Sequence, residues 1–131
     1  MVDVQRFVDV YAQPQSGAER AMEREACGAN EGAWGYTTRA QADLLAERLA
    51  LTRGMRLLDI GAGRGWPSLY LTRLTGCHAT ITDVPEPGIR DAQSRARRQR
   101  LLRRCSFIVA SGTHLPFRPS TFDAVIHTDT L

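Results

Sequence analysis

The residues with the clearest chemical potential lie in a glycine-rich stretch, LLDIGAGRG, that runs from Leu57 to Gly65. A short apolar run ends there in closely spaced glycines, which let a backbone turn sharply and let a ligand approach without Cβ atoms in the way. Asp59 precedes the first glycine by two residues. Its carboxylate would face the loop, where it would repel a pyrophosphate and suit a ligand with a positive end. Tight structural turns also use such glycines, so the loop alone is weak evidence for a site.

A second acidic residue, Asp83, lies 22 residues after Gly61, at the end of the next β-branched run. An acid at this offset and strand end is placed to accept hydrogen bonds from both hydroxyls of a ribose. The alternative is an aspartate that forms a turn or caps a helix before Pro85. Because Asp83 occurs together with the glycine loop, the ribose interpretation is the better one.

The spacing of the glycines separates two classes of nucleotide cofactor. A dinucleotide fingerprint, G-x-G-x-x-G, requires glycine or alanine at position 66, where this chain has Trp66. The glycines here follow the pattern G-x-G-x-G at positions 61, 63 and 65. A nicotinamide-dependent oxidoreductase is therefore disfavoured, and a cofactor with a cationic end is favoured.

The elements that must position these residues follow from the periodicity of the apolar side chains. From Met55 onwards, strand-like runs alternate with helices of about 10–15 residues, which indicates a parallel sheet with helices on both faces. Further helical stretches precede this pattern. The expected helices cover residues 2–12, 18–27, 37–51, 66–75 and 88–102, and the expected strands cover residues 55–60, 78–82, 106–110 and 122–126.

These motifs resemble those of the class I (Rossmann-like) S-adenosylmethionine-dependent methyltransferases. The segment LLDIGAGRGWPSLYL (57–71) is similar to their first motif, Thr82-Asp83 to their acidic second motif, and ASGTHLPFRPSTFDAVI (110–126) to their third and fourth strands. The resemblance implies an α/β fold of the Rossmann-like three-layer α/β/α type. Its parallel sheet would have the order 3-2-1-4, would be truncated after the fourth strand and would be preceded by N-terminal helices.

A complete domain of this family has seven strands, so the chain resembles only the N-terminal half. We expect an N-terminal helical segment at 1–33 and, at 34–131, an incomplete S-adenosylmethionine-binding methyltransferase domain that lacks strands 5–7. Such a chain would be a fragment, a half domain that pairs with another chain, or a gene remnant.

The resemblance also implies roles for individual residues toward S-adenosylmethionine as cofactor. Asp59 would orient the ammonium group of its methionine part, Asp83 would hold the ribose hydroxyls, and Val84 would lie against the adenine. The family often has an acid beside the adenine, where this chain has Ser111 and Gly112. The backbone that lines the methionine part would come from Gly61, Ala62 and Gly63.

Two further segments would lie near the reacting end of the cofactor. The loop from Trp34 to Thr37 corresponds to one that often covers the methionine end. His127 and Asp129 follow the fourth strand, where the family often places acceptor-side residues, and an ordinary solvated loop is the alternative. The catalytic residues stay unknown, because the sulfonium is already activated and positioning of the acceptor can supply most of the barrier reduction.

We therefore expect an S-adenosylmethionine-dependent methyltransferase, or its cofactor-binding half, that acts on a small-molecule acceptor. The Asn/Asp-Pro-Pro-aromatic motif of enzymes that methylate amino groups of nucleic acids is absent at the end of the fourth strand. The alternative is a noncatalytic module, which would associate with itself or with a second chain through an open sheet edge, or contact RNA through an arginine-rich helix.

Charge and cysteine content bound the remaining classes. All 17 basic residues are arginine, and seven of them lie between Arg90 and Arg104 with a single acid, so the net charge of +3 is local. Such a run is more often a solvated helix face, so nucleic acid is disfavoured as a partner. The three cysteines lack metal-site spacing, and no metal is expected. No apolar run approaches the ~20 residues of a membrane helix, so we expect a cytoplasmic protein without membrane contact.

Overall fold

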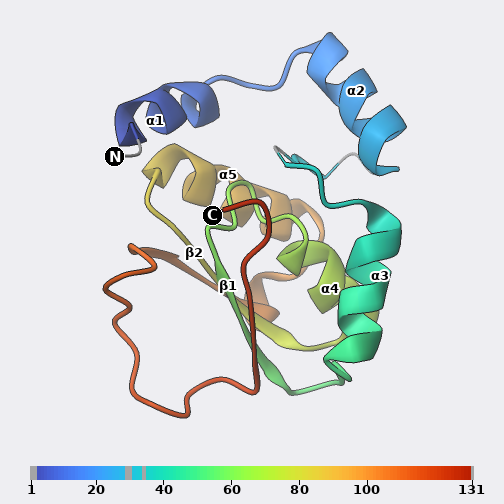
Figure 1. Ribbon diagram of the computed structural model, residues 1–131, viewed down its shortest axis with the longest axis vertical. Coiled ribbons are helices and arrows are strands. Elements are labelled where there is room, and N and C mark those ends of the chain that lie inside the picture. Colours follow the sequence, from blue (N-terminus) through green and yellow to red (C-terminus); the bar gives the residue numbers. More distant parts are fainter. Residues whose placement is uncertain (1–2, 29–30, 34, 131) are drawn as a thin grey trace.

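A computed structural model describes residues 3–28, 31–33 and 35–130 (Figure 1). Its centre is a sheet in the order β3-β2-β1-β4. The pairings of β1 with β2, β1 with β4 and β2 with β3 are all parallel. The parallel sheet that the alternating pattern predicted, and the strand order that the resemblance implied, are therefore confirmed. The strands are β1 (Arg56–Ile60), β2 (His78–Asp83), β3 (Cys105–Val109) and β4 (Ala124–Ile126).

Helices precede the sheet and connect its first strands. Ser16 Oγ accepts from the Glu19 amide, and Thr38 Oγ1 accepts from the Gln41 amide, so two of these helices begin with a capping box. Such caps satisfy amide donors that the first turn of a helix leaves without partners. The helices are α1 (Val4–Ala12), α2 (Gly17–Cys27), α3 (Arg39–Arg48), α4 (Ser68–Thr75) and α5 (Glu86–Arg98), and a 3₁₀ turn, η1 (Leu102–Arg104), leads into β3.

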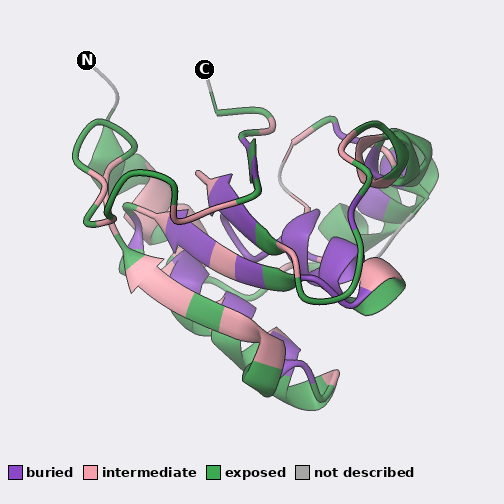
Figure 2. Cartoon of the chain, turned by 90° about the horizontal axis from the view of Figure 1, so that it is seen from below, coloured by how far each residue is buried: buried purple, intermediate pink, exposed green. Residues whose placement is uncertain are grey.

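The core lies between one face of the sheet and helices α3, α4 and α5. Leu57, Ala79 and Ala124 are register partners in β1, β2 and β4, so their side chains point to the same face. All three are buried. The central strands β1 and β2 are therefore largely buried, whereas the edge strand β3 is mixed (Figure 2). The helices contribute six buried side chains to this core: Ala42, Tyr70, Leu71, Ile89, Ala92 and Ala96.

The opposite face of the sheet carries no helix within the described ranges 3–28, 31–33 and 35–130. The second layer of helices of a three-layer fold is therefore not formed by this part of the chain. The long β3–β4 connection, residues 110–123, covers part of that face, since a Cβ on Gly112 would lie 2.9 Å from Ile60 Cγ2. Val125 of β4 is 51% exposed on it. The helices that cover this face in a three-layer domain have no counterpart in the segment between β3 and β4.

Several elements end earlier than the apolar pattern predicted, because the backbone turns at residues with a left-handed conformation. Ala50 has a φ of 48°, and α3 ends at Arg48 rather than near 51. Arg100 has a φ of 59°, and α5 ends at Arg98 rather than at 102. Left-handed residues close helices by redirecting the chain, and propensity alone does not place them at non-glycine positions.

Candidate cofactor site

Most residues that the sequence singles out meet at the carboxyl edge of the sheet (Figure 1). The glycine loop, residues 61–65, follows β1, Asp83 ends β2, and residues 110–112 follow β3. The backbone ties these ends together, since the Ala110 amide donates to the Asp83 carbonyl at 3.0 Å. Open α/β sheets bind their ligands at this edge, where the strand order reverses.

Three amide groups of the glycine loop donate hydrogen bonds to the end of β2 and are therefore not free to bind a ligand. The amides of Gly61 and Ala62 donate to the Thr82 carbonyl, at 2.8 and 2.9 Å. The Gly63 amide donates to Asp83 Oδ2 at 2.7 Å. A pyrophosphate cradle needs such amides directed at the ligand. The loop instead presents Cα atoms and carbonyl oxygens, which suit a cationic group better than an anion.

Close packing of two helices depends on Gly65 rather than on the residue at position 66. A Cβ on Gly65, which has a φ of 93°, would lie 2.8 Å from Leu69 Cδ1 and 3.3 Å from Ala92 Cβ. A larger residue there would push α4 and α5 apart. Trp66 is a core residue, 6% exposed, and its Nε1 donates to the Thr37 carbonyl at 2.9 Å. The residue that breaks the dinucleotide fingerprint thus anchors the segment before α3.

Asp83 ends β2 with its carboxylate bonded to neighbouring backbone. Oδ2 accepts from the Gly63 amide and Oδ1 from the Val84 amide, each at 2.7 Å. Burial raises the pKa of Asp83, and the two amide bonds oppose that rise. Each carboxylate oxygen has a further lone pair, so it can also accept from hydroxyl groups. The ribose role stays a prediction, and this donor set fits it.

Asp59 lies beneath the glycine loop rather than on its surface. Its side chain is fully buried, and neither carboxyl oxygen forms a hydrogen bond of regular geometry with a described residue, although the hydroxyl and amide of Ser68 lie nearby. Burial raises the pKa of Asp59 to about 8; donors of nearby Ser68 oppose the rise and the charge of Asp83 adds to it. A buried carboxyl group without a partner is costly. Asp59 is therefore a place where a cationic ligand group would be stabilised, although its predicted contact with an ammonium group stays a prediction.

Two side chains that the sequence did not single out face the glycines. A Cβ on Gly61 would overlap Thr130 Cγ2, and a Cβ on Gly63 would lie 2.7 Å from the Tyr11 hydroxyl. Burial first, then the charge of Asp83, raises the pKa of Tyr11 to about 12. Helical spacing marked Tyr11 only as an apolar position of its helix. No local signal connects it with a loop so distant in the sequence.

The residues with expected adenine roles border the same edge. Val84 is 38% exposed, just beyond Asp83. Ser111 Oγ lies 2.9 Å from Thr113 Oγ1, and Gly112 packs over Ile60. The structure thus brings these residues to the expected end of the sheet, and their contact with adenine stays a prediction.

The segment after β4 is held by bonds to the segment before α3. Asp129 Oδ2 accepts from the amides of Tyr36 and Thr37, at 3.0 Å each, and from the Thr37 hydroxyl at 2.7 Å. Asp129 therefore has a structural contact, while His127 is exposed. Trp34, which was expected to cover the methionine end, lies outside the described residues. Asp129 also borders a cavity of about 510 Å³.

The parallel sheet, the glycine loop and the strand-end acids define an α/β domain of the kind that binds a nucleotide-like cofactor. Sequence comparison identifies the protein family to which this domain belongs. Residues 57–131 match the sequence model of a family described as "Methyltransferase domain". The chain belongs to this family.

Relatives in sequence are longer than this chain. It is 36% identical over 81 residues to "Methyltransferase GfsG" of Streptomyces halstedii, covering 62% of this chain and 29% of that protein. It is 32% identical over 90 residues to "Ubiquinone/menaquinone biosynthesis C-methyltransferase UbiE" of Cereibacter sphaeroides, covering 68% of this chain and 36% of that protein. The chain thus spans about a third of the length of these curated relatives.

Solved structures share the fold. The [4+2]-cyclase SpnF superposes with a TM-score of 0.70 and 28% identity, covering 93% of this chain and 47% of that one. A SAM-dependent methyltransferase from Thiobacillus denitrificans, in complex with S-adenosyl-L-homocysteine, has a TM-score of 0.64 and 19% identity. This superposition covers 89% of the present chain and 45% of the methyltransferase chain. The second likeness supports the fold alone.

Within the part of the chain that the structure describes, two other kinds of site are not found. None of its helices is both long and apolar enough to cross a membrane. No three histidine, cysteine or acidic side chains gather there as a metal site would require. Cys27 and Cys77 are buried free thiols, and Cys105 is a partly buried one.

Proposed function

We propose that this chain is the cofactor-binding half of an S-adenosylmethionine-dependent methyltransferase with a small-molecule acceptor. One observation carries the proposal: the glycine loop has its amides satisfied internally and is bordered by two acids, Asp59 and Asp83. Such a wall repels a pyrophosphate and suits a ligand that combines cationic groups with ribose hydroxyls. S-adenosylmethionine has this composition, and its sulfonium would supply an activated methyl group.

The residues of this chain would divide the binding between them. Asp83 would accept from the ribose hydroxyls with the lone pairs that its amide bonds leave over. Asp59 would compensate a cationic charge from beneath the loop. Gly61 and Gly63 would let the ligand approach the backbone once the side chains of Thr130 and Tyr11, which now pack against these glycines, move aside. These two side chains would help to exclude water from the reacting end.

The acceptor would enter beside α3. The cavity of about 510 Å³ is lined by Leu44 and Leu45 on one side and by Thr128 and Asp129 on the other. Thr128 precedes by two residues Thr130, which faces Gly61, and this link to the glycine loop supports the cavity as the acceptor side. The name of the UbiE relative, a quinone C-methyltransferase, supports an apolar small molecule as acceptor.

Calorimetry tests the proposal directly. S-adenosylmethionine and S-adenosylhomocysteine should both bind the folded chain, while NAD should not. Asp83→Asn should weaken binding of S-adenosylmethionine by about 1–3 kcal/mol, because charge-assisted hydrogen bonds are lost. No heat with either sulfur compound at millimolar concentration, on a sample shown to be folded by circular dichroism, would overturn the cofactor assignment.

Asp123→Asn is the matched control for that measurement. Asp123 Oδ2 also accepts from a backbone amide at a strand end, that of Arg56 at 2.7 Å, but at the amino edge of the sheet. Its substitution should leave the affinity for S-adenosylmethionine unchanged. Equal losses in the two variants would mean that the effect comes from the sheet and not from a ribose contact at Asp83.

A second candidate function rests on the edge of β4. In the described residues β4 pairs with β1 alone, and Val125 is 51% exposed. An unpaired strand edge favours association with another strand, so a noncatalytic half domain would assemble through it. Sedimentation of the chain and of Val125→Lys separates the two functions. A monomer in both cases removes the association, whereas a wild-type dimer that the substitution dissociates supports it.

A further inference from the structure

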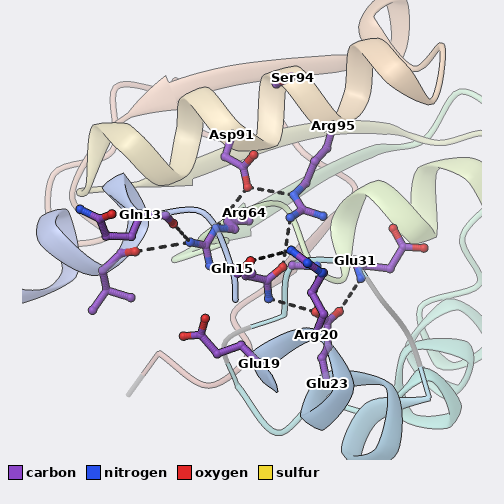
Figure 3. Close-up of polar contacts among 12 residues, drawn as sticks. Gln13, Gln15, Glu19, Arg20, Glu23, Glu31, Arg64, Asp91, Ser94 and Arg95 are labelled. Carbon is purple, nitrogen blue, oxygen red and sulfur yellow. Dashed lines mark hydrogen bonds and ion pairs between the residues drawn. The ribbon is translucent and has the colours of Figure 1, made fainter. Parts of the chain in front are cut away.

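Three arginines converge on a cavity next to the glycine loop. This cavity, of about 430 Å³, lies between the α1–α2 connection and α5, and Arg20 of α2, Arg64 of the loop and Arg95 of α5 line it. The guanidinium groups approach one another around Gln15 (Figure 3). We call it the arginine cavity. Asp91 is the one acid among its lining residues in the described part of the chain.

Arg64 is buried with part of its hydrogen-bonding capacity unused. Its side chain is 3% exposed. Nε pairs with Asp91 at 3.1 Å, and Nη2 donates to the carbonyls of Gln13 at 2.8 Å and Val10 at 3.4 Å. Nη1 has no hydrogen-bond partner within residues 3–28, 31–33 and 35–130. Such a buried donor is costly unless an acceptor reaches it, and a guanidinium cannot lose its charge.

The charge of the arginine cavity is only partly balanced. Asp91 Oδ2 is shared between Arg64 at 3.1 Å and Arg95 at 2.9 Å, so one carboxylate serves two guanidinium groups. Arg20 Nη1 donates to the Gln15 carbonyl at 2.5 Å, and Arg95 Nη2 donates to Gln15 Oε1 at 3.3 Å. Three positive groups thus surround one negative group.

The neighbouring glutamates are engaged elsewhere. Glu23 accepts from Gln15 Nε2 at 3.1 Å and from the Gly32 amide at 3.3 Å, and it also bonds to the Glu31 amide. Glu19 accepts from the Ser16 amide in the capping box of α2. Neither carboxylate forms an ion pair with an arginine of the cavity in the described residues. Glu19 is nevertheless close enough to attract Arg20 and Arg64, so three guanidinium groups are balanced by two carboxylates, those of Asp91 and Glu19, and the cavity keeps a net positive charge.

We propose that the arginine cavity binds an anionic group, a phosphate or a carboxylate, of a ligand. Guanidinium groups recognise both anions through paired hydrogen bonds. The glycine loop, with its amides used internally and two acids beside it, is unsuited to the same group. The anion could come from two sources: an acceptor molecule, or the carboxylate of the cofactor proposed above.

Titration with inorganic phosphate by calorimetry, at constant ionic strength, tests the site without any assumption about the cofactor. The wild-type chain should bind phosphate, and Arg20→Gln and Arg95→Gln should each weaken binding about tenfold. Arg64 stays intact, because its bonds to Val10 and Gln13 hold α1 in place. The two substituted side chains lie nearer the surface, and circular dichroism would verify that both variants fold.

Arg98→Gln is the matched control, because other arginines of α5 could attract phosphate non-specifically. Arg98 lies on the exposed side of the same helix and donates to Ser94. Its substitution should leave phosphate affinity unchanged. Equal affinities of Arg95→Gln and Arg98→Gln, or no binding by the wild-type chain at tens of millimolar phosphate, would overturn the site.

A repeat of the titration with saturating S-adenosylmethionine distinguishes the sources. Unchanged phosphate affinity assigns the site to the anion of a separate molecule, and competition assigns it to the carboxylate of the cofactor. The experiment tests the anion site and the proposed methyltransferase function independently of each other. Phosphate binding that depends on Arg20 and Arg95 would persist if the chain did not bind S-adenosylmethionine at all.

Discussion

Tyr11 contacts two regions of opposite charge at the carboxyl edge of the sheet. Its hydroxyl faces Gly63, beside which Asp83 and the buried Asp59 lie. The Arg64 guanidinium lies 5.1 Å from the centre of its ring, on the side of the arginine cavity. The first region suits a cation and the second an anion, although both border the same short loop, residues 61–65.

The two regions differ in how they tolerate burial of charge. Arg64 keeps its charge, so it needs the Asp91 carboxylate and two backbone carbonyls as partners. Asp59 forms no ion pair or regular hydrogen bond in the described residues, and burial raises its pKa to about 8, which favours the protonated carboxyl group. The acidic region is therefore sensitive to pH near neutrality, while the basic region depends on its contacts.

The largest expected effect concerns Asp59 and the pH dependence of stability. Burial raises its pKa from 3.8 to about 8, so between these values the folded chain keeps a proton that the unfolded chain has lost. The free energy of unfolding should therefore fall as the pH rises through this window, by on the order of 5 kcal/mol. Asp59→Asn should remove this component and be more stable than wild type at pH 9. Urea unfolding at pH 5 and pH 9 measures it, and parallel pH profiles of the two proteins would contradict it.

The next effect concerns the partners of Arg64. Arg64→Gln leaves Asp91 and the end of α1 without the guanidinium that joins them, and breaking such a buried pair should cost about 3 kcal/mol. Arg90→Gln, which breaks the exposed pair with Glu86, should change stability little. Urea unfolding at pH 7 compares them. Equal losses would show that Arg64 has no special role in holding α1.

A smaller effect links Asp59 to cofactor binding. If Asp59 must ionise to compensate a cationic ligand, its raised pKa means that affinity for S-adenosylmethionine should increase about tenfold from pH 6 to pH 7. Asp59→Asn should bind more weakly and lack this dependence. Calorimetry at both pH values measures the difference. A wild-type affinity that is the same at both would separate Asp59 from the ligand charge.

The smallest effect concerns the Tyr11 hydroxyl. Tyr11→Phe keeps the ring beside Arg64 and removes only the hydroxyl at Gly63, so the free energy of unfolding should change by less than about 1 kcal/mol. Tyr11→Ala removes the ring as well and should cost about 2–3 kcal/mol. Urea unfolding measures both. A Phe variant as unstable as the Ala variant would assign the contact to the hydroxyl and not to the ring.

Much of the fold could be predicted, because its signals are local. The glycine spacing and the run of alternating strands and helices placed β1, β2 and their connections, and Asp83 lies at the predicted strand end. The covering of the second sheet face could not be read from the alternating pattern, since the connection 110–123 contains no helix. The acceptor-side expectation for Asp129 also missed that Tyr36 and Thr37 bind its carboxylate. Pairing of such distant segments leaves no periodic trace.

Residue types and their spacing alone specified the family, the order of elements and the loop that ends β1. They could not specify that the pKa of Asp59 is raised, because desolvation in the folded chain and not residue type causes that rise. Nor could they show that Tyr11, Arg20, Arg64 and Arg95 share one cavity wall. Only packing of α1 and the α1–α2 connection against α5 brings these side chains together, since contacts between segments distant in sequence form when the chain buries its apolar surface.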